Sequence, residues 1–171
     1  MENPLNEEEK KKIIIIVMIG NISAGKSDFI YAISKNRNIH GGLHKVGIDS
    51  ERVRLTIDNE QIPILLSNTE GQDKFRSLSP VYFRKAKGFI FMFNTSYKET
   101  FENMKNWYLS AKQQREYQIQ SMIIGNNNKI NNKPREVDKS DVYQLAKTYN
   151  DLYYEIDNEY DSNILFYVKD L

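Results

Sequence analysis

The chain has 171 residues, of which 40% are hydrophobic, and this length predicts one compact domain with a sizeable core. Its 24 basic and 23 acidic residues give a net charge of +1 and are spread along the sequence, so we expect neither a nucleic-acid partner nor a polybasic membrane arm. With no cysteine, the chain has no disulfide, no thiolate metal site and no cysteine-borne lipid anchor, and an intracellular protein is the default expectation.

An apolar run over 13–19 is the first structural signal. It follows acidic and basic residues at 7–12, but it is too short to cross a bilayer, and no small-residue cleavage site follows it. Continuous β-branched residues are typical of a parallel strand that is buried on both faces. We therefore predict a central strand here, preceded by a flexible segment over 1–10 and opening a domain over 11–171.

The residues directly after this run match the phosphate-binding loop pattern of glycine, four residues and Gly-Lys-Ser. In order they are Gly20, Asn21, Ile22, Ser23, Ala24, Gly25, Lys26 and Ser27. A buried strand that ends in a glycine turn and leads into a helix presents several backbone N–H groups to one phosphate. Lys26 would then reach the terminal phosphates, and the Ser27 hydroxyl would bind magnesium. The alternative is an ordinary strand–turn–helix corner that happens to contain Gly-Lys-Ser.

Helices and strands alternate along the rest of the chain. The spacing of apolar residues predicts helices over 28–35, 98–114 and 138–149. Apolar runs and alternating patterns predict further strands over 49–58, 62–66, 88–94, 121–125 and 152–156. This order indicates a parallel sheet covered on both faces, with ligands at the carboxyl ends of the strands. The phosphate loop lies at such an end.

The strand over 49–58 alternates apolar and charged residues and is of the edge type. An irregular loop is expected before it, over 36–42, and Asn59-Glu60 should form a tight turn after it. Pro63 lies inside the following strand, where it has no N–H to donate to the ladder. We therefore expect a bulge or an irregular start at Pro63.

Further motifs occur in a fixed order after the phosphate loop: Glu70–Leu78, Tyr82–Ala86 and Asn103–Trp107. Together with the loop they resemble the small GTPases of the Ras superfamily, and Val46–Asp49 resembles the switch I signature of the Rab branch. The resemblance covers about residues 11–170. It implies the α/β fold of P-loop NTPases, with a mainly parallel sheet, one antiparallel edge strand and helices on both faces.

The same resemblance implies a function. GTP or GDP would be the bound nucleotide, with Mg²⁺ beside it. Protein effectors or regulators would contact a switch surface around 45–50 and 70–86, in vesicle traffic or signalling. The resemblance also implies a set of nucleotide-binding residues: Gly20, Ser23, Ala24, Gly25, Lys26, Ser27, Gly71 and Asn126.

Two changes affect the expected magnesium site. Lys45 stands where the family has a threonine that binds the metal, and Asn68 replaces the aspartate of its Asp-x-x-Gly motif. Only Ser27 remains as a metal ligand. Because magnesium requires near-octahedral oxygen coordination, its binding here should be weak and should depend on the nucleotide phosphates and water.

The expected guanine site is changed as well. Lys129 stands where the family has an aspartate that accepts hydrogen bonds from guanine, and it can only donate. The family's Ser-Ala-Lys motif corresponds to Asp157-Asn158-Glu159. Losing two charge-assisted hydrogen bonds would weaken guanine binding about a hundred- to ten-thousand-fold. The alternative for the asparagines at 126–128 is a loop of solvated side chains with no base contact.

Hydrolysis in the family needs a glutamine that orients the attacking water, and Gln72 occupies that position. Ile22 stands where the family has glycine or another small residue, and its branched side chain should crowd Gln72 and any arginine offered by a partner. Glu70 adds a carboxylate near the phosphates. We therefore expect intrinsic hydrolysis to be very slow or absent, with a poor response to an activating protein.

Three functional hypotheses remain open at this point. The first is a degenerate Rab-like regulatory module, and the second is a GTP-binding switch with slow hydrolysis in which Lys45 contacts phosphates directly. The third is an ATP-using kinase or ATPase, since the altered base site no longer excludes adenine. We expect a cytoplasmic protein that partners recruit to endomembranes.

Two smaller expectations concern the partner surface and the end of the chain. Tyr82, Phe83 and Trp107 are candidates for contact with a partner, and core packing is the alternative, especially for Trp107. Asn163-Ile164 match the start of the family's last helix, and Leu171 closes the sequence about two turns later. A short last helix is therefore expected.

Overall fold

The structure is a computed structural model that describes residues 13–35, 50–57, 59–69, 84–113, 120–127 and 133–157. The predicted N-terminal segment and last helix lie outside these residues, and so does the expected switch surface except for Ser50 and residues 84–86. Within the described residues, no helix is long and apolar enough to span a bilayer.

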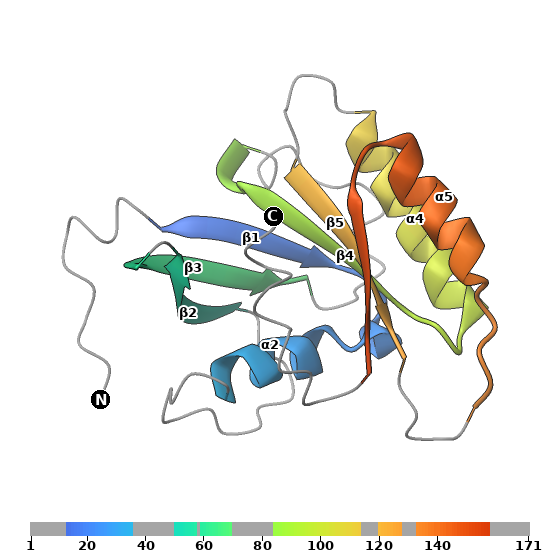
Figure 1. Cartoon of the computed structure of the whole chain (residues 1–171), viewed down its shortest axis with the longest axis horizontal. Helices are drawn as coiled ribbons and strands as arrows, with labels where there is room; N and C mark the ends of the chain where they lie inside the picture. Colours follow the sequence, from blue (N-terminus) through green and yellow to red (C-terminus); the bar gives the residue numbers. More distant parts are fainter. Residues whose placement is uncertain are drawn as a thin grey trace.

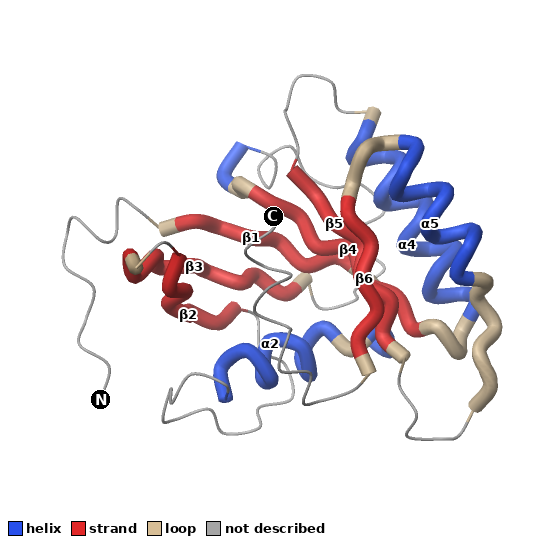
Figure 2. The backbone as a smooth tube through the Cα atoms, viewed as in Figure 1, coloured by secondary structure: helices blue, strands red, loops and turns tan. Residues whose placement is uncertain are grey.

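One mixed sheet organises the described residues, with strand order β2-β3-β1-β4-β5-β6 (Figures 1 and 2). The strands are β1 (Ile14–Ile19), β2 (Ser50–Ile57), β3 (Glu60–Asn68), β4 (Gly88–Asn94), β5 (Gln120–Asn126) and β6 (Leu152–Ile156). The helices are the 3-10 turn η1 (Ile22–Ala24), α2 (Lys26–Lys35), α4 (Lys98–Lys112) and α5 (Lys139–Thr148). β2 pairs antiparallel with β3, and every other neighbouring pair is parallel. The predicted α/β fold with one antiparallel edge strand is confirmed.

Alternate residues of the central strands face two separate cores, because successive side chains of a strand point to opposite faces. On β4, Ile90 and Met92 pack in the core that contains the apolar face of α2, whereas the three phenylalanines that alternate with them pack against α4 and α5. Figure 1 shows α2 on one side of the sheet and the α4–α5 pair on the other. Trp107 of α4 is partly buried against the second core, as the core-packing alternative expects.

The edge hairpin is regular. Its strands keep one continuous register from Ser50 opposite Ser67 to Ile57 opposite Glu60, and Asn59 has a left-handed φ of 66° in the turn. Pro63 pairs opposite Arg54 within this register, so the expected bulge is wrong. The reason lies in its position: β1 begins to pair with β3 only at the next residue, so the parallel ladder loses no N–H at Pro63.

Helix boundaries agree closely with the pattern-based expectation. α2 begins at Lys26, two residues before the predicted start, and α4 ends at Lys112. α5 starts after Asp138, whose side chain accepts a hydrogen bond from the Ser140 backbone N–H as an N-cap. α2 therefore begins inside the phosphate-binding pattern, at its lysine.

Candidate functional site

The phosphate loop connects the carboxyl end of β1 to the start of α2. Gly25 has a φ of 87°, a left-handed conformation that favours glycine, and it lets the chain pass from η1 directly into α2. At Gly20, a Cβ atom would lie 2.4 Å from the carbonyl oxygen of Met92, so the loop packs against β4 too closely for any side chain there. Both glycines of the motif are therefore required by geometry.

Lys26 points back into this loop. Its side chain is 3% exposed, and Nζ donates hydrogen bonds to the carbonyl oxygens of Gly20 at 2.6 Å and Asn21 at 2.7 Å. A buried ammonium needs such acceptors, because desolvation penalises an uncompensated charge. The loop therefore holds a cation at the position where the sequence predicts a phosphate contact.

Two asparagines from neighbouring strands hold the loop in place. Asn126, at the end of β5, donates from Nδ2 to the carbonyl oxygen of Ala24 at 3.3 Å, and Asn94, at the end of β4, donates to that of Ser23 at 3.4 Å. A Cβ atom on Gly25 would lie only 2.0 Å from Nδ2 of Asn126. The loop conformation therefore depends on the ends of both strands.

The expected metal side of the site contains neutral groups. Asn68, at the end of β3, is 8% exposed and donates from Nδ2 to the Ser27 hydroxyl at 3.3 Å. Thr69 then fixes the strand end, because its N–H and hydroxyl both donate to the carbonyl oxygen of Met18. Among the described residues, no group of three or more His, Cys, Asp or Glu side chains could hold a metal ion.

Three buried side-chain oxygens in the described part of the chain have no hydrogen-bond donor, and all three are close to the loop: Asn21 Oδ1, Asn68 Oδ1 and Asn126 Oδ1. An orphaned acceptor in a folded protein calls for an explanation. A phosphate oxygen cannot satisfy it, since both atoms accept, but a cation, a metal-bound water or an N–H donor can. The residues present therefore fit a phosphate at Lys26 with a hydrated divalent cation near Ser27 and Asn68, held without a protein carboxylate among the described residues.

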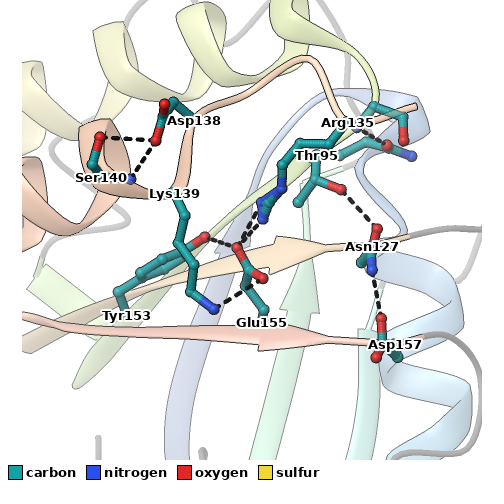
Figure 3. Close-up of polar contacts among 11 residues, drawn as sticks. Thr95, Asn127, Arg135, Asp138, Lys139, Ser140, Tyr153, Glu155 and Asp157 are labelled. Carbon is teal, nitrogen blue, oxygen red and sulfur yellow. Dashed lines mark hydrogen bonds and ion pairs between the residues drawn. The ribbon is translucent and has the colours of Figure 1, made fainter. Parts of the chain in front are cut away.

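Beside the loop, a short chain of hydrogen bonds links β4, β5 and β6 (Figure 3). The Thr95 hydroxyl donates to Oδ1 of Asn127 at 3.2 Å, and Nδ2 of Asn127 donates to Oδ1 of Asp157 at 2.6 Å. The Asn127 N–H also donates to the Ile156 carbonyl at 2.8 Å. Asn126 is buried, so the interpretation as a solvated side chain is wrong for this residue, whereas Asn127 is partly exposed and hydrogen-bonded. Residues 128–132, including Lys129, lie outside the described residues.

Thr95 also holds the segment that leads into α5. It is fully buried, its N–H donates to the Asn126 carbonyl, and its own carbonyl accepts from the N–H groups of Glu136 at 2.9 Å and Val137 at 3.1 Å. The Ser96 hydroxyl donates to the Lys133 carbonyl at 3.1 Å in the same region. The chain is therefore anchored to β4 both before residue 128 and after residue 132.

Glu155 of β6 is the centre of a second polar group (Figure 3). Its carboxylate accepts hydrogen bonds from Tyr153 and Arg135 and lies 3.4 Å from Lys139 Nζ. Burial alone would raise the pKa of this carboxyl, but the hydrogen bonds from Tyr153 and Arg135 and the nearby positive charges outweigh it and hold the pKa below its ordinary value. Burial, followed by the interaction with Glu155, raises the pKa of Tyr153.

The structure brings together most of the sequence-predicted site residues at the carboxyl edge of the sheet: Gly20, Ser23, Ala24, Gly25, Lys26, Ser27 and Asn126. Gly71 and Gln72 lie outside the described residues. Ile22 is 82% exposed on the loop, and its crowding of Gln72 stays a prediction. Sequence reasoning missed Asn94 and Thr95, although a polar pair that ends the apolar run of β4 is a usable signal.

Comparison with known proteins supports the resemblance. The model of the Ras family matches residues 15–169. Human EF-hand calcium-binding domain-containing protein 4B is 33% identical over 140 residues, which cover 81% of this chain and 19% of that protein. Ras-related protein Rab-8A of Pongo abelii is 26% identical over 133 residues, with coverage of 78% and 64%.

The Ras and EF-hand domain-containing protein homolog of Mus musculus is 29% identical over 158 residues, which cover 87% of this chain and 25% of that protein. The chain thus spans less than two thirds of the length of each of these relatives. Because the family model extends over nearly the whole sequence and over a site with the expected arrangement, the protein belongs to the Ras family of small GTPases and is similar to its Rab members.

Proposed function

We propose that the protein is a Rab-like regulatory module that binds nucleotide mainly through its phosphates, with weakened magnesium and guanine recognition. Ras-family GTPases generally bind GTP or GDP with Mg²⁺ and interact with protein effectors and regulators. Under this proposal the protein shares that general activity and differs from other family members in the side chains around the nucleotide. Its role would be in vesicle traffic or signalling.

The observation that carries the proposal is the buried Lys26 ammonium inside the closed loop. The carbonyl oxygens of Gly20 and Asn21 hold it, and the left-handed Gly25 keeps the loop in the conformation that leads into α2. A cation next to the first backbone N–H groups of a helix favours an anionic ligand. Phosphate binding is therefore the part of the family's chemistry that the described residues support best.

Weakened magnesium binding rests on the neutral side chains near Ser27. Asn68 offers an amide oxygen where the family has a carboxylate, so the site lacks that negative charge beside a divalent cation. Magnesium keeps several waters and binds through phosphates when protein ligands are few. Magnesium should therefore bind mainly through the phosphates of a bound nucleotide and only weakly without one.

A second candidate is a GTP-binding switch with slow hydrolysis. It is favoured by the hydrogen bond from Asn126 to the Ala24 carbonyl, which joins β5 to the phosphate loop, together with the presence of Gln72 in the sequence. In this case GTP and GDP would bind tightly and Gln72 would act at a low rate. Ile22 would still limit the response to an activating protein.

Nucleotide titration separates the two candidates. Purified protein is freed of nucleotide and titrated with fluorescent GDP, GTP, ADP and ATP, each with and without Mg²⁺. We expect micromolar or weaker binding, little dependence on Mg²⁺ and less than about a hundredfold preference for guanine. Saturable, Mg²⁺-dependent binding with a strong guanine preference would overturn the proposal in favour of the switch.

A matched pair of lysine variants tests the phosphate contact. Lys26→Met should weaken binding of every diphosphate by about 10- to 100-fold, since a charge-assisted hydrogen bond contributes about 1.5–3 kcal/mol. Lys147→Met, on the exposed face of α5, is the control and should leave binding unchanged. No nucleotide binding at all, or equal binding by the Lys26 variant, would overturn both candidates.

The cellular part of the proposal follows the family. Partners would contact the surface around 45–50 and 70–86 and recruit a cytoplasmic protein to endomembranes. Fluorescence microscopy of the tagged protein, with and without substitutions in 70–86, measures this recruitment. A membrane signal that persists when that surface is changed would count against it.

A further inference from the structure

Asn94, at the carboxyl end of β4, is a buried side chain that joins this strand to the phosphate loop. It is 2% exposed, and its Nδ2 donates to the Ser23 carbonyl at 3.4 Å. Its Oδ1 accepts a hydrogen bond from the Ser96 backbone N–H at 2.9 Å. The backbone N–H of Asn94 donates to the Thr100 hydroxyl at 2.9 Å, so the end of the strand is held as well.

The two side-chain bonds of Asn94 are of opposite kinds. Ser23 offers an acceptor and Ser96 offers a donor, so the side chain between them must donate and accept at once. An amide does both, whereas a carboxylate only accepts and an ammonium only donates. Because each end of the amide has its own partner, the hydrogen bonds also fix which end faces the loop. Nδ2 is therefore the atom that holds the loop.

One peptide unit extends the effect of this bond into the loop. The Ser23 carbonyl and the Ala24 N–H belong to the same trans peptide, so they point in opposite directions. A carbonyl held toward β4 directs this N–H away from β4, where it donates to the Asn21 carbonyl at 3.1 Å. The same Asn21 carbonyl accepts from Lys26 Nζ at 2.7 Å. Asn94 is therefore linked to the Lys26 ammonium through one peptide and one carbonyl.

Loss of the Asn94 contact has two consequences for an anion in the loop. The peptide between Ser23 and Ala24 becomes free to turn, and the N–H that helps to orient the Asn21 carbonyl is then lost. The Ser23 carbonyl, without its donor, can also turn toward the mouth of the loop, where its oxygen cannot donate to a phosphate oxygen and repels it. Both changes weaken phosphate binding without altering Lys26 itself.

We propose that Asn94 is a positioning residue for phosphate binding, which holds the Ser23 carbonyl and thereby orients the Asn21 carbonyl that places Lys26. The inference rests on the proposed function, because it concerns how the same loop holds phosphates. It deepens that function, since the affinity of the loop for phosphate is set in part from β4, by a residue outside the phosphate-binding pattern.

The test is a double-mutant cycle on ligand affinity. In Asn94→Ser the hydroxyl can still accept from the Ser96 N–H, but the side chain is too short to reach Ser23. Calorimetric titration should show pyrophosphate, ADP and GDP all weakened about three- to tenfold, the effect of one neutral hydrogen bond. In a Lys26→Met background the same substitution should change each Kd less than about twofold, because the ammonium that Asn94 positions is absent.

Asp138→Ala is the control for a purely structural effect. Its side chain bonds to Ser140 at the start of α5 rather than to the loop, so the substitution should lower Tm and leave every Kd unchanged. Asn94→Ala removes both side-chain bonds and should weaken binding at least as much as Asn94→Ser. Thermal denaturation shows which variants are folded at the titration temperature, and Asn94→Ala takes the place of Asn94→Ser if only the alanine variant is folded.

The outcomes separate this inference from the proposed function. If the three ligands bind and Lys26→Met weakens them all, but Asn94→Ser leaves their Kd unchanged, the inference is wrong and the proposed function stands. The same conclusion follows if Asn94→Ser has an equal effect in the Lys26→Met background, or if Asp138→Ala weakens binding as much. If no ligand binds to the wild-type protein, both are wrong. A threefold or larger loss that disappears in Lys26→Met and is absent from Asp138→Ala supports the inference.

Discussion

Gly25→Ala is the perturbation that tests most directly how the phosphate loop is held. The φ of 87° at Gly25 is strained for any other residue, at a cost of about 1–2 kcal/mol. The new Cβ would also lie 2.0 Å from Nδ2 of Asn126, so the asparagine must move and give up its bond to the Ala24 carbonyl. The lost bond and the displaced buried side chain add about 1–2 kcal/mol. The free energy of unfolding should therefore fall by about 3 kcal/mol.

A double-mutant cycle with Asn126→Ala divides this loss into its two causes. Removing the asparagine side chain removes the collision but leaves the strain at φ of 87°, so the two substitutions should be coupled by about 1–2 kcal/mol. Urea denaturation followed by circular dichroism measures each free energy, and 1 kcal/mol corresponds to about 2–4 °C in Tm for a chain of this size.

Gly20→Ala is the matched control for the cycle. The main obstacle at Gly20 is the carbonyl oxygen of Met92, 2.4 Å from the new Cβ, followed by the Ala24 Cβ at 3.1 Å, and Asn126→Ala removes neither atom. Gly20→Ala and Asn126→Ala should therefore be additive within about 0.5 kcal/mol. The reasoning is refuted if Gly25→Ala and Asn126→Ala are additive within the same margin.

Three further predictions concern groups outside the loop. Asp151→Ala should lower the free energy of unfolding by about 3 kcal/mol, because the nearly buried Lys112 loses the carboxylate that lies 2.7 Å from its Nζ; a loss under about 1 kcal/mol in urea denaturation would contradict this. Asp138→Ala should lower Tm through loss of the N-cap bond to Ser140, whereas Asp138→Asn should not, and equal Tm values for the two variants would exclude a capping role. The pKa of Glu155 is held below its ordinary value of 4.5, so its contacts stabilise the fold above that pH and the stabilisation is lost as the pH falls through the folded-state pKa. In Glu155→Gln, the free energy of unfolding should therefore fall less between about pH 5 and pH 3 than it does in the wild type. The same pH dependence in both proteins would count against the ion pairs.

The sequence patterns predicted the sheet and its helices well, because each strand and helix carries its own local signal. The runs at 13–19 and 88–94 are apolar on both faces and became the central strands β1 and β4. The expectation at Pro63 was wrong because its cost depends on where β1 starts to pair with β3, which is a property of the register between distant segments. Local rules cannot supply that register.

For the candidate site, too, the sequence predicted the local part and missed contacts between distant segments. The phosphate loop is contiguous in sequence, so a pattern found it, and Asn126 was found through the resemblance. Asn94 is hydrogen-bonded to Ser23, which is 71 positions earlier in the sequence, and Asp157 is hydrogen-bonded to Asn127, which is 30 positions earlier. Such contacts follow from the order of strands in the sheet, which places the ends of β4, β5 and β6 side by side.

Thr95 connects three separate segments at the carboxyl edge of the sheet. Its backbone and hydroxyl groups bond to the end of β5 and to the segment before α5 at the same time. A shift of β4 by a fraction of an ångström would therefore displace the asparagine pair at 126–127 and the start of α5 together. The residues that border the phosphate loop are thus hydrogen-bonded to the segment that leads into α5, and α5 packs beside α4 on the face of the sheet opposite α2.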